Sequence, residues 1–195
     1  MELKTLGTLP KTFPEREALV CNLLLDTKRE GIEKLLEFLR VGGYFTAPAS
    51  TRYHGVYAGG LMAHSLHVYA LVEDFDKVFA LQTPQESLII AALLHDVCKM
   101  GAYLKCADKP GYYWNKDQPK GHALLSLVRI REFIKLTELE TKMIQYHMGI
   151  YGLQEFDEKG EYPLRDKGLA NAWFHFPIVK LMYFADELAA FLEKN

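Results

Sequence analysis

The segment Ser87-Leu-Ile-Ile-Ala-Ala-Leu-Leu-His-Asp96 decides the fold. Apolar side chains fill every position between Ser87 and His95, so a helix here is apolar on all sides and is predicted to lie inside the domain. An ionised aspartate at the inner end of such a helix costs on the order of several kcal/mol unless a cation or hydrogen-bond donors compensate it. A bound metal ion is the simplest compensation at Asp96.

Two more polar side chains stand on predicted apolar helix faces. Asp186 shares the apolar stripe of a helix expected from Pro177 to Glu193, and His64 lies on the apolar stripe of a helix expected from Leu61 to about Leu81. Imidazole and carboxylate ligands together suit manganese, iron, nickel, zinc or magnesium and do not choose among them. Taken singly, each histidine is more often a core or surface residue than a ligand, so only the joint pattern indicates a metal site.

The remaining periodicity predicts an all-α, compact, single domain over residues 1–195. Residues 14–40 indicate two helices broken near Gly31, and further helices are expected at 121–135 and 137–147. Thr83 followed by Glu86 and Thr137 followed by Glu140 both match the capping box that opens a helix. The turn residues 108–111 lie between β-prone residues, which predicts a small β-hairpin insertion near 103–115.

Composition excludes several classes of function. Lys and Arg total 23 against 25 Asp and Glu, so a net charge of -2 provides no broad basic surface for long nucleic acid. The longest apolar run, Leu88 to Leu94, is too short for a membrane span, and the N-terminal residues lack a signal-peptide apolar stretch. Three widely spaced cysteines match no disulfide framework, which favours a cytoplasmic protein. The oligomeric state does not follow from the sequence.

The order of the candidate ligands resembles the successive metal-site motifs of the HD superfamily of phosphohydrolases. The resemblance extends over about residues 52–190, and its closer likeness is to the HD module of bacterial 3'-5' exoribonucleases, especially in GGLMAHSL and LLHDVCK. The segments that carry it are YHGVYAGGLMAHSLHV, AALLHDVCK, KGHALLS, QYHMGIYG and LMYFADEL.

The resemblance implies a role for each matching residue. It places the first metal on His64, His95, Asp96 and Asp186, with Asp96 bridging to any second ion. His122 and His147 match positions that complete a second metal site in some members and contact substrate in others. Lys99 matches a phosphate-binding position, although a lysine in the last turn of a helix also interacts favourably with the helix dipole. His54 is expected to add a donor at the mouth of the pocket.

These roles predict a metal-dependent phosphohydrolase that cleaves a phosphomonoester or phosphodiester bond of a nucleotide or short oligonucleotide. A bound divalent metal can lower the pKa of water from about 16 to about 7, which provides hydroxide at neutral pH, while the metal and Lys99 stabilise charge on the phosphoryl oxygens. Asp96 and Lys99 are therefore the expected catalytic residues. Two alternatives remain open, a di-iron oxygenase built on the same fold and a noncatalytic nucleotide-sensing module.

An aromatic cluster within the expected hairpin also has two interpretations. Trp114 and the neighbouring Tyr112-Tyr113 pair could stack against a nucleobase, because every base presents a flat π face. Clusters of this kind more often cover the core of a domain.

Overall fold

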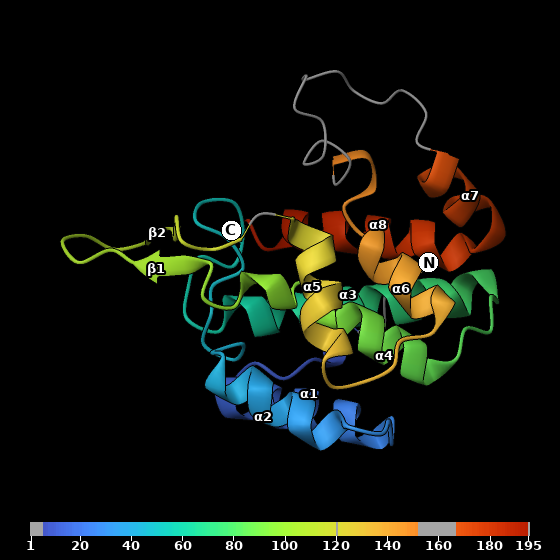
Figure 1. Ribbon diagram of the computed structural model, residues 1–195, viewed down its shortest axis with the longest axis horizontal. Helices are drawn as coiled ribbons and strands as arrows, with labels where there is room; N and C mark the ends of the chain where they lie inside the picture. Colours follow the sequence, from blue (N-terminus) through green and yellow to red (C-terminus); the bar gives the residue numbers. More distant parts are fainter. Residues whose placement is uncertain (1–5, 120, 152–166, 195) are drawn as a thin grey trace.

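The structure is a computed structural model that describes residues 6–119, 121–151 and 167–194. The described chain is all-α apart from one two-stranded hairpin, as predicted (Figure 1). Its α-helices are α1 (Phe13–Asp26), α2 (Ile32–Val41), α3 (Gly60–Phe79), α4 (Gln85–Leu94), α5 (His122–Arg131), α6 (Glu138–Gln145), α7 (Lys167–His175) and α8 (Pro177–Leu192). Further elements are the 3-10 helices η1 (Leu6–Thr8) and η2 (Val97–Lys99) and the strands β1 (Tyr103–Lys105) and β2 (Tyr112–Trp114).

The helix α4 lies at the centre of the bundle. All of its residues from Ser87 to Leu94 are buried, which confirms the prediction from its uninterrupted apolar sequence. It packs against α1, α3 and α6, while α3 packs in turn against α8 (Figure 1). The two elements that follow α4 in the chain, His95-Asp96 and η2, are therefore delivered to the interior where α3, α5, α6 and α8 meet.

The starts of α3 and α6 follow from local sequence. Thr137 accepts a hydrogen bond from the Glu140 amide and Glu140 reaches back to the Thr137 amide, so the predicted capping box is present. At α3, Gly60 lies so close to the Gly55 carbonyl that any side chain there would overlap it. This close approach brings the first turn of α3, and with it His64, against the preceding loop.

The second predicted capping box is wrong. Helix α4 begins at Gln85 with Pro84 in the capping position, and no side chain caps it. The Thr83 amide instead donates to Asp76 Oδ1 at 3.1 Å, and Gln82 adopts a left-handed backbone conformation with φ of 59°. The contact with α3 therefore determines the backbone that enters α4, and tertiary structure overrides the local signal.

The hairpin lies where the sequence predicted it but is shorter. Strands β1 and β2 pair antiparallel with Tyr103 opposite Trp114 and Leu104 opposite Tyr113. The hairpin follows η2 in the chain and projects from the helical body (Figure 1). Because side chains alternate across a strand, Tyr103 and Trp114 share one face and Leu104 and Tyr113 the other.

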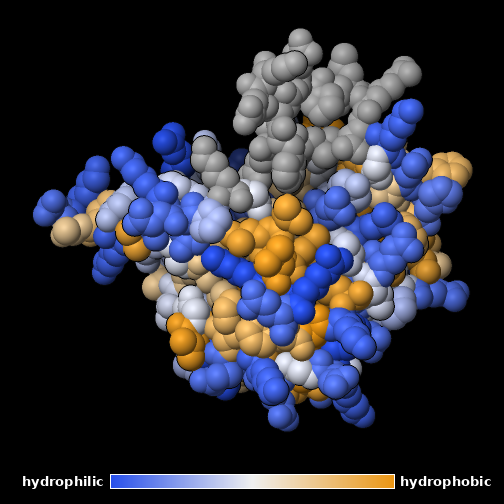
Figure 2. Space-filling view, viewed as in Figure 1, coloured by the Kyte–Doolittle hydropathy of each residue, from blue (hydrophilic) through white to orange (hydrophobic). Residues whose placement is uncertain are grey.

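Helix α7 was not predicted. Only Leu169 and Ala172 of its nine residues are buried, so its apolar stripe is too short to stand out in the sequence. Within residues 6–119, 121–151 and 167–194, no helix combines the length and apolar character of a membrane span. Figure 2 shows an apolar patch over α5, where Leu124 and Val128, one turn apart, are each about half exposed.

Candidate metal centre

Four histidines share one orientation, with Nδ1 held by a neighbouring group and Nε2 turned toward the two buried aspartates. The Nδ1 atoms of His95 and His147 lie 2.8 and 2.7 Å from the carbonyl oxygens of Ala92 and Ile144, three residues back in each chain segment. A carbonyl oxygen only accepts, so Nδ1 carries the proton and Nε2 presents its lone pair. The other two rings are held by Glu193, 3.2 Å from His64 Nδ1, and by Cys98 Sγ, 3.1 Å from His122 Nδ1.

The Nε2 atoms converge on Asp96 and Asp186. His64 Nε2 lies 2.9 Å from Asp186 Oδ1, and His122 Nε2 lies 2.8 Å from Asp96 Oδ1. His95 Nε2 lies 3.3 Å from Asp96 Oδ2 and 3.7 Å from Asp186 Oδ1, and His147 Nε2 lies 3.6 Å from Asp96 Oδ1. The six predicted ligand residues therefore come together, although they belong to five different segments of the chain.

These six residues form overlapping groups whose ligand atoms lie within 4.8 Å of one another. One group is His64, His95 and Asp186, and a second is His95, Asp96 and His147. The third joins Asp96 and His122 with Cys98. Because neighbouring groups share His95 or Asp96, the arrangement has room for one ion or for two that share a carboxylate.

The donor set fits a divalent metal. The Nε2 atoms of His95 and His147 are buried and have no hydrogen-bond partner among the described residues. A buried polar atom without a partner costs about 1–3 kcal/mol, and a metal ion accepts such a lone pair directly. Imidazole and carboxylate donors, with each imidazole oriented through its other nitrogen, are the usual composition of such sites.

The pKa shifts show that the cluster stabilises negative carboxylates through nearby positive charge. Burial alone would raise the pKa of Asp96, but the charge of Lys99 and the charge and hydrogen bond of His122 outweigh it and lower the pKa well below its usual value. Burial likewise opposes the charged form of Asp186, yet the hydrogen bond with His64 lowers its pKa. Both carboxylates are therefore ionised and available as ligands at neutral pH.

The histidines of the cluster respond to the same carboxylates. Burial would lower the pKa of His64, but hydrogen bonds with Asp186 and Glu193 raise it to about 9. Burial lowers the pKa of His147, which accordingly stays neutral and keeps a free lone pair. Between His64 Nε2 and the Asp186 carboxylate a positive charge must reside, either a proton or a metal ion, because both groups are otherwise acceptors.

Lys99 contacts the cluster at Asp96, whereas His54 contacts it at His64. Lys99 ends η2, and its ammonium lies 2.5 Å from Asp96 Oδ2 with the side chain 12% exposed. His54 lies beside His64, with ring centroids 4.6 Å apart, and its buried Nε2 has no hydrogen-bond partner in the described chain. Burial, together with the nearby charges of His64 and Lys99, lowers the pKa of His54 to about 4.

Two contacts to the cluster were missed in the sequence. Glu193 follows Asp186 by seven positions, which places both on one face of a helix, and it bridges His64 and His67, whose Nδ1 lies 2.6 Å away. That spacing was the available signal. Cys98 holds His122 from η2, and its two-residue separation from Asp96 was the corresponding signal.

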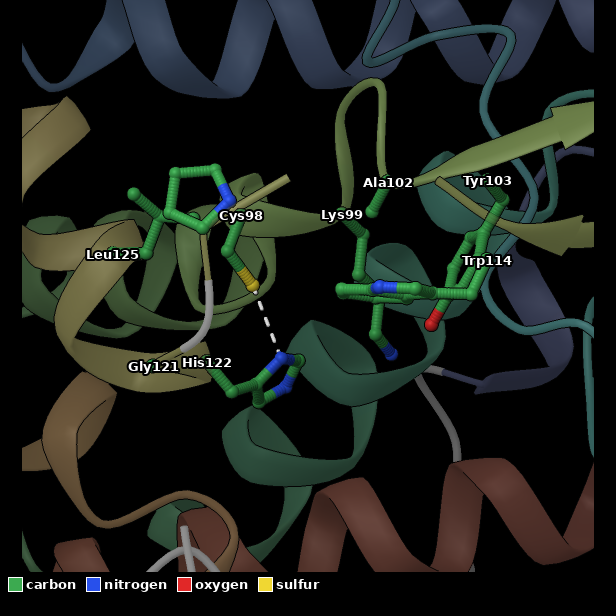
Figure 3. A pocket seen from close by; sticks show the side chains of 9 residues that line it. Cys98, Lys99, Ala102, Tyr103, Trp114, Gly121, His122 and Leu125 are labelled. Carbon is green, nitrogen blue, oxygen red and sulfur yellow. Dashed lines mark hydrogen bonds between the residues drawn. The ribbon is translucent and has the colours of Figure 1, made fainter. Parts of the chain in front are cut away.

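A pocket of about 390 Å³ opens beside the cluster (Figure 3). Lys99 and His122, which both contact Asp96, form part of its wall. Tyr103 and Trp114 of the hairpin stand on the side of Lys99, and Leu125 on the side of His122 (Figure 3). His54 is not among the residues that line this pocket, and its role at the mouth of a substrate pocket stays a prediction.

Comparison with known proteins yields one partial similarity. The chain is 32% identical over 66 residues to the dihydroneopterin 2',3'-cyclic phosphate phosphodiesterase of Methanocaldococcus jannaschii, and the match covers 32% of this chain. It spans 26% of that relative's length, about a quarter. No family model matches the chain. No solved structure matches it significantly. The chain is thus similar, over about a third of its length, to a protein named as a phosphodiesterase.

Proposed function

We propose that this protein is a metal-dependent phosphohydrolase of the HD type that cleaves a phosphomonoester or phosphodiester bond in a nucleotide or short oligonucleotide. The observation that carries the proposal is the common orientation of four histidines, each with Nδ1 held and Nε2 aimed at Asp96 or Asp186. Among these rings, the Nε2 lone pairs of His95 and His147 are buried without a hydrogen-bond partner in the described chain, which costs free energy unless a cation receives them. The similarity to a phosphodiesterase supports the same class of reaction.

In this proposal His64, His95, Asp96 and Asp186 hold the first metal. A divalent ion held there supplies a water of lowered pKa, from about 16 to about 7, which is a nucleophile at neutral pH. His147 and His122 flank Asp96 on its other oxygen and either complete a second site or contact the substrate.

Lys99 contributes positive charge where phosphoryl oxygens require it. Its ammonium lies against Asp96 and also lines the pocket, so it stands between the carboxylate cluster and any ligand in that space. Because burial is outweighed by Asp96, the pKa of Lys99 is raised and the side chain stays protonated. A fixed ammonium in a partly dry site stabilises charge that develops on a transferring phosphoryl group.

The substrate is proposed to be small. The pocket volume of about 390 Å³ suits a nucleotide-sized ligand, since ligand pockets commonly measure roughly 300–1,000 Å³. The net charge of -2 gives no extended basic track for a long nucleic-acid backbone. The curated relative also bears the name of a small cyclic phosphate as its substrate.

The test combines metal content, turnover and one matched pair of variants. Purified protein should retain a divalent metal and release phosphate or nucleotide from a panel of nucleoside monophosphates, cyclic nucleotides and dinucleotides. Asp186→Asn should lose metal and lower turnover by at least about 100-fold, because the ion supplies several kcal/mol of transition-state stabilisation. Glu187→Gln, an exposed neighbour on α8, should change neither.

Three outcomes would contradict the proposal. Equal turnover in the two variants would exclude the cluster as the reaction centre. About two irons per chain with oxygen-dependent turnover and no hydrolysis would favour the oxygenase. Nucleotide binding without any turnover, in metal-loaded protein, would favour a sensing module.

A further inference from the structure

The pocket beside the metal cluster has two chemically different ends. The polar end consists of Cys98, Lys99 and His122, all within contact of one another or of Asp96. The other end is formed by apolar and aromatic groups, with Trp114 and Tyr103 on the wall that the hairpin supplies (Figure 3). A ligand that fills this space must therefore combine a charged group with a flat or apolar one.

The aromatic wall is held in a defined position. Tyr103 and Trp114 are opposite each other in the hairpin register, with ring centroids 5.8 Å apart and planes at 71°, an edge-to-face arrangement. The hairpin base is closed by the Asn115 amide, which donates to the Ala102 carbonyl at 2.9 Å. Trp114 nevertheless remains 44% exposed and lines the pocket, so much of its surface is not covered by the core.

Arg129 ties this wall to the segment that carries the metal ligands. Its Nη1 lies 3.0, 3.1 and 3.2 Å from the carbonyl oxygens of Val97, Cys98 and Met100, and its Nη2 lies 3.1 Å from Gln118 Oε1. One guanidinium therefore joins η2 to the chain that returns from the hairpin. This contact restricts movement of the hairpin relative to η2 before a ligand arrives, which lowers the cost of binding.

The aromatic end has few groups that could read the edge of a base. Among the described lining residues of that end, Ala102 and Pro119 have no polar side-chain atom, while Tyr103 carries a hydroxyl and Trp114 an indole N–H. The indole N–H lies in the plane of its ring, so it does not reach the edge of a base stacked on the face of that ring. Hydrogen bonds to base edges distinguish one base from another, whereas stacking does not, because every base has a π face.

We propose that this pocket binds the planar heteroaromatic base of the phosphate ester, with Trp114 as the stacking surface, and that it accepts different bases while requiring one. This inference rests on the proposed function, since it names the substrate class of the same site. It assigns the hairpin a role in substrate recognition, while Lys99 and the metal cluster receive the phosphate.

Binding can be measured without turnover. Trp173→Phe leaves Trp114 as the single tryptophan, because the sequence holds two, and Trp173 lies on α7 and does not line the pocket. In the presence of EDTA, AMP and CMP should quench the fluorescence of Trp114, with dissociation constants within about tenfold of each other. Ribose 5-phosphate, which lacks a base, should bind about 5- to 150-fold more weakly and leave the fluorescence unchanged.

A matched set of hairpin variants isolates the stacking surface. By calorimetry, Trp114→Ala should weaken AMP about 5- to 150-fold and leave ribose 5-phosphate unaffected, whereas Trp114→Phe should retain most of the affinity for AMP. Tyr113→Ala is the control, because Tyr113 is 51% exposed on the opposite face of the same strand. Unchanged melting temperatures would show that the hairpin variants remain folded.

Two results would overturn the inference. Equal affinities of AMP and ribose 5-phosphate would show that no base is bound, and a Trp114→Ala variant that binds AMP like the parent would remove the stacking surface. Neither result depends on hydrolysis. Failure of the phosphohydrolase proposal would appear separately, as lack of turnover by metal-loaded protein that still quenches with AMP.

Discussion

Glu193 should determine how tightly the candidate metal centre binds a divalent ion. Its carboxylate oxygens lie 3.2 and 3.3 Å from His64 Nδ1, and one of them lies 2.6 Å from His67 Nδ1. The side chain is 7% exposed, so water does not readily replace these contacts. Burial opposes its ionisation, but hydrogen bonds with His64 and His67 lower the pKa of Glu193 to about 2, so it is a carboxylate at neutral pH.

Glu193→Gln keeps the shape of the side chain and removes its charge. A carboxylate behind a ligating imidazole fixes the ring and increases its basicity, and loss of such a partner typically costs about 10- to 100-fold in metal affinity. That range corresponds to about 1.4–2.7 kcal/mol. We expect His67→Asn, which removes only the second partner of Glu193, to produce a smaller decrease than Glu193→Gln.

The assay is a zinc titration of metal-free protein in competition with a chromophoric chelator. A purely structural role for Glu193 would change the melting temperature of the metal-free protein and leave the affinity for zinc unchanged. Glu187→Gln serves as the control on the same helix, because its side chain is exposed. Equal zinc affinity in Glu193→Gln and the parent would refute the reasoning.

The structure makes further predictions away from this contact. Glu140→Gln should lower the free energy of unfolding by about 2–4 kcal/mol at pH 7 in urea titrations, because the buried carboxylate accepts four hydrogen bonds, two of them from Arg29. Glu138→Gln, with a side chain 72% exposed, should change it by less than about 0.5 kcal/mol. Burial raises the pKa of Glu140, but the hydrogen bonds with Arg29 and its neighbours outweigh this and lower it. The contribution of Glu140 to the free energy of unfolding is therefore full above the unfolded pKa of about 4.3 and is lost as the pH falls through the folded pKa. If the free energies of parent and variant differed by the same amount from neutral pH into strong acid, the assignment would be contradicted. Cys98→Ala should lower turnover by less than about tenfold, because a thiol is a weak partner for His122, and Cys98→Ser should restore it; identical turnover in all three proteins would show that the contact has no role.

The sequence predicted those parts of the site that interrupt an apolar pattern. Asp96 follows a helix without a polar face by two residues, and Asp186 lies on an apolar stripe, so burial of both could be inferred from periodicity alone. The hairpin followed from its turn residues. Each of these signals is local, within one turn or one helix.

Features that depend on contacts between elements could not be predicted in this way. The partnership of Glu193 with His64 joins residues 129 positions apart, across the packing of α3 against α8. The contact of the Thr83 amide with Asp76 likewise arises from packing and displaces a cap that its sequence favours. Periodicity assigns a residue to the interior but does not say which other interior residue it meets.

The lone pairs of His95 and His147 have a consequence for the durability of the fold. A backbone carbonyl three residues back holds each ring through Nδ1, which opposes rotation of the ring toward another partner. Without a metal ion, the buried Nε2 atoms of both rings therefore lower the stability of the folded chain. An ion that relieves this burden stabilises the native state by mass action, about 4 kcal/mol at a concentration 1,000 times its dissociation constant. An ion bound at this centre would therefore stabilise the folded bundle, and we expect chelators to lower the melting temperature of metal-loaded protein.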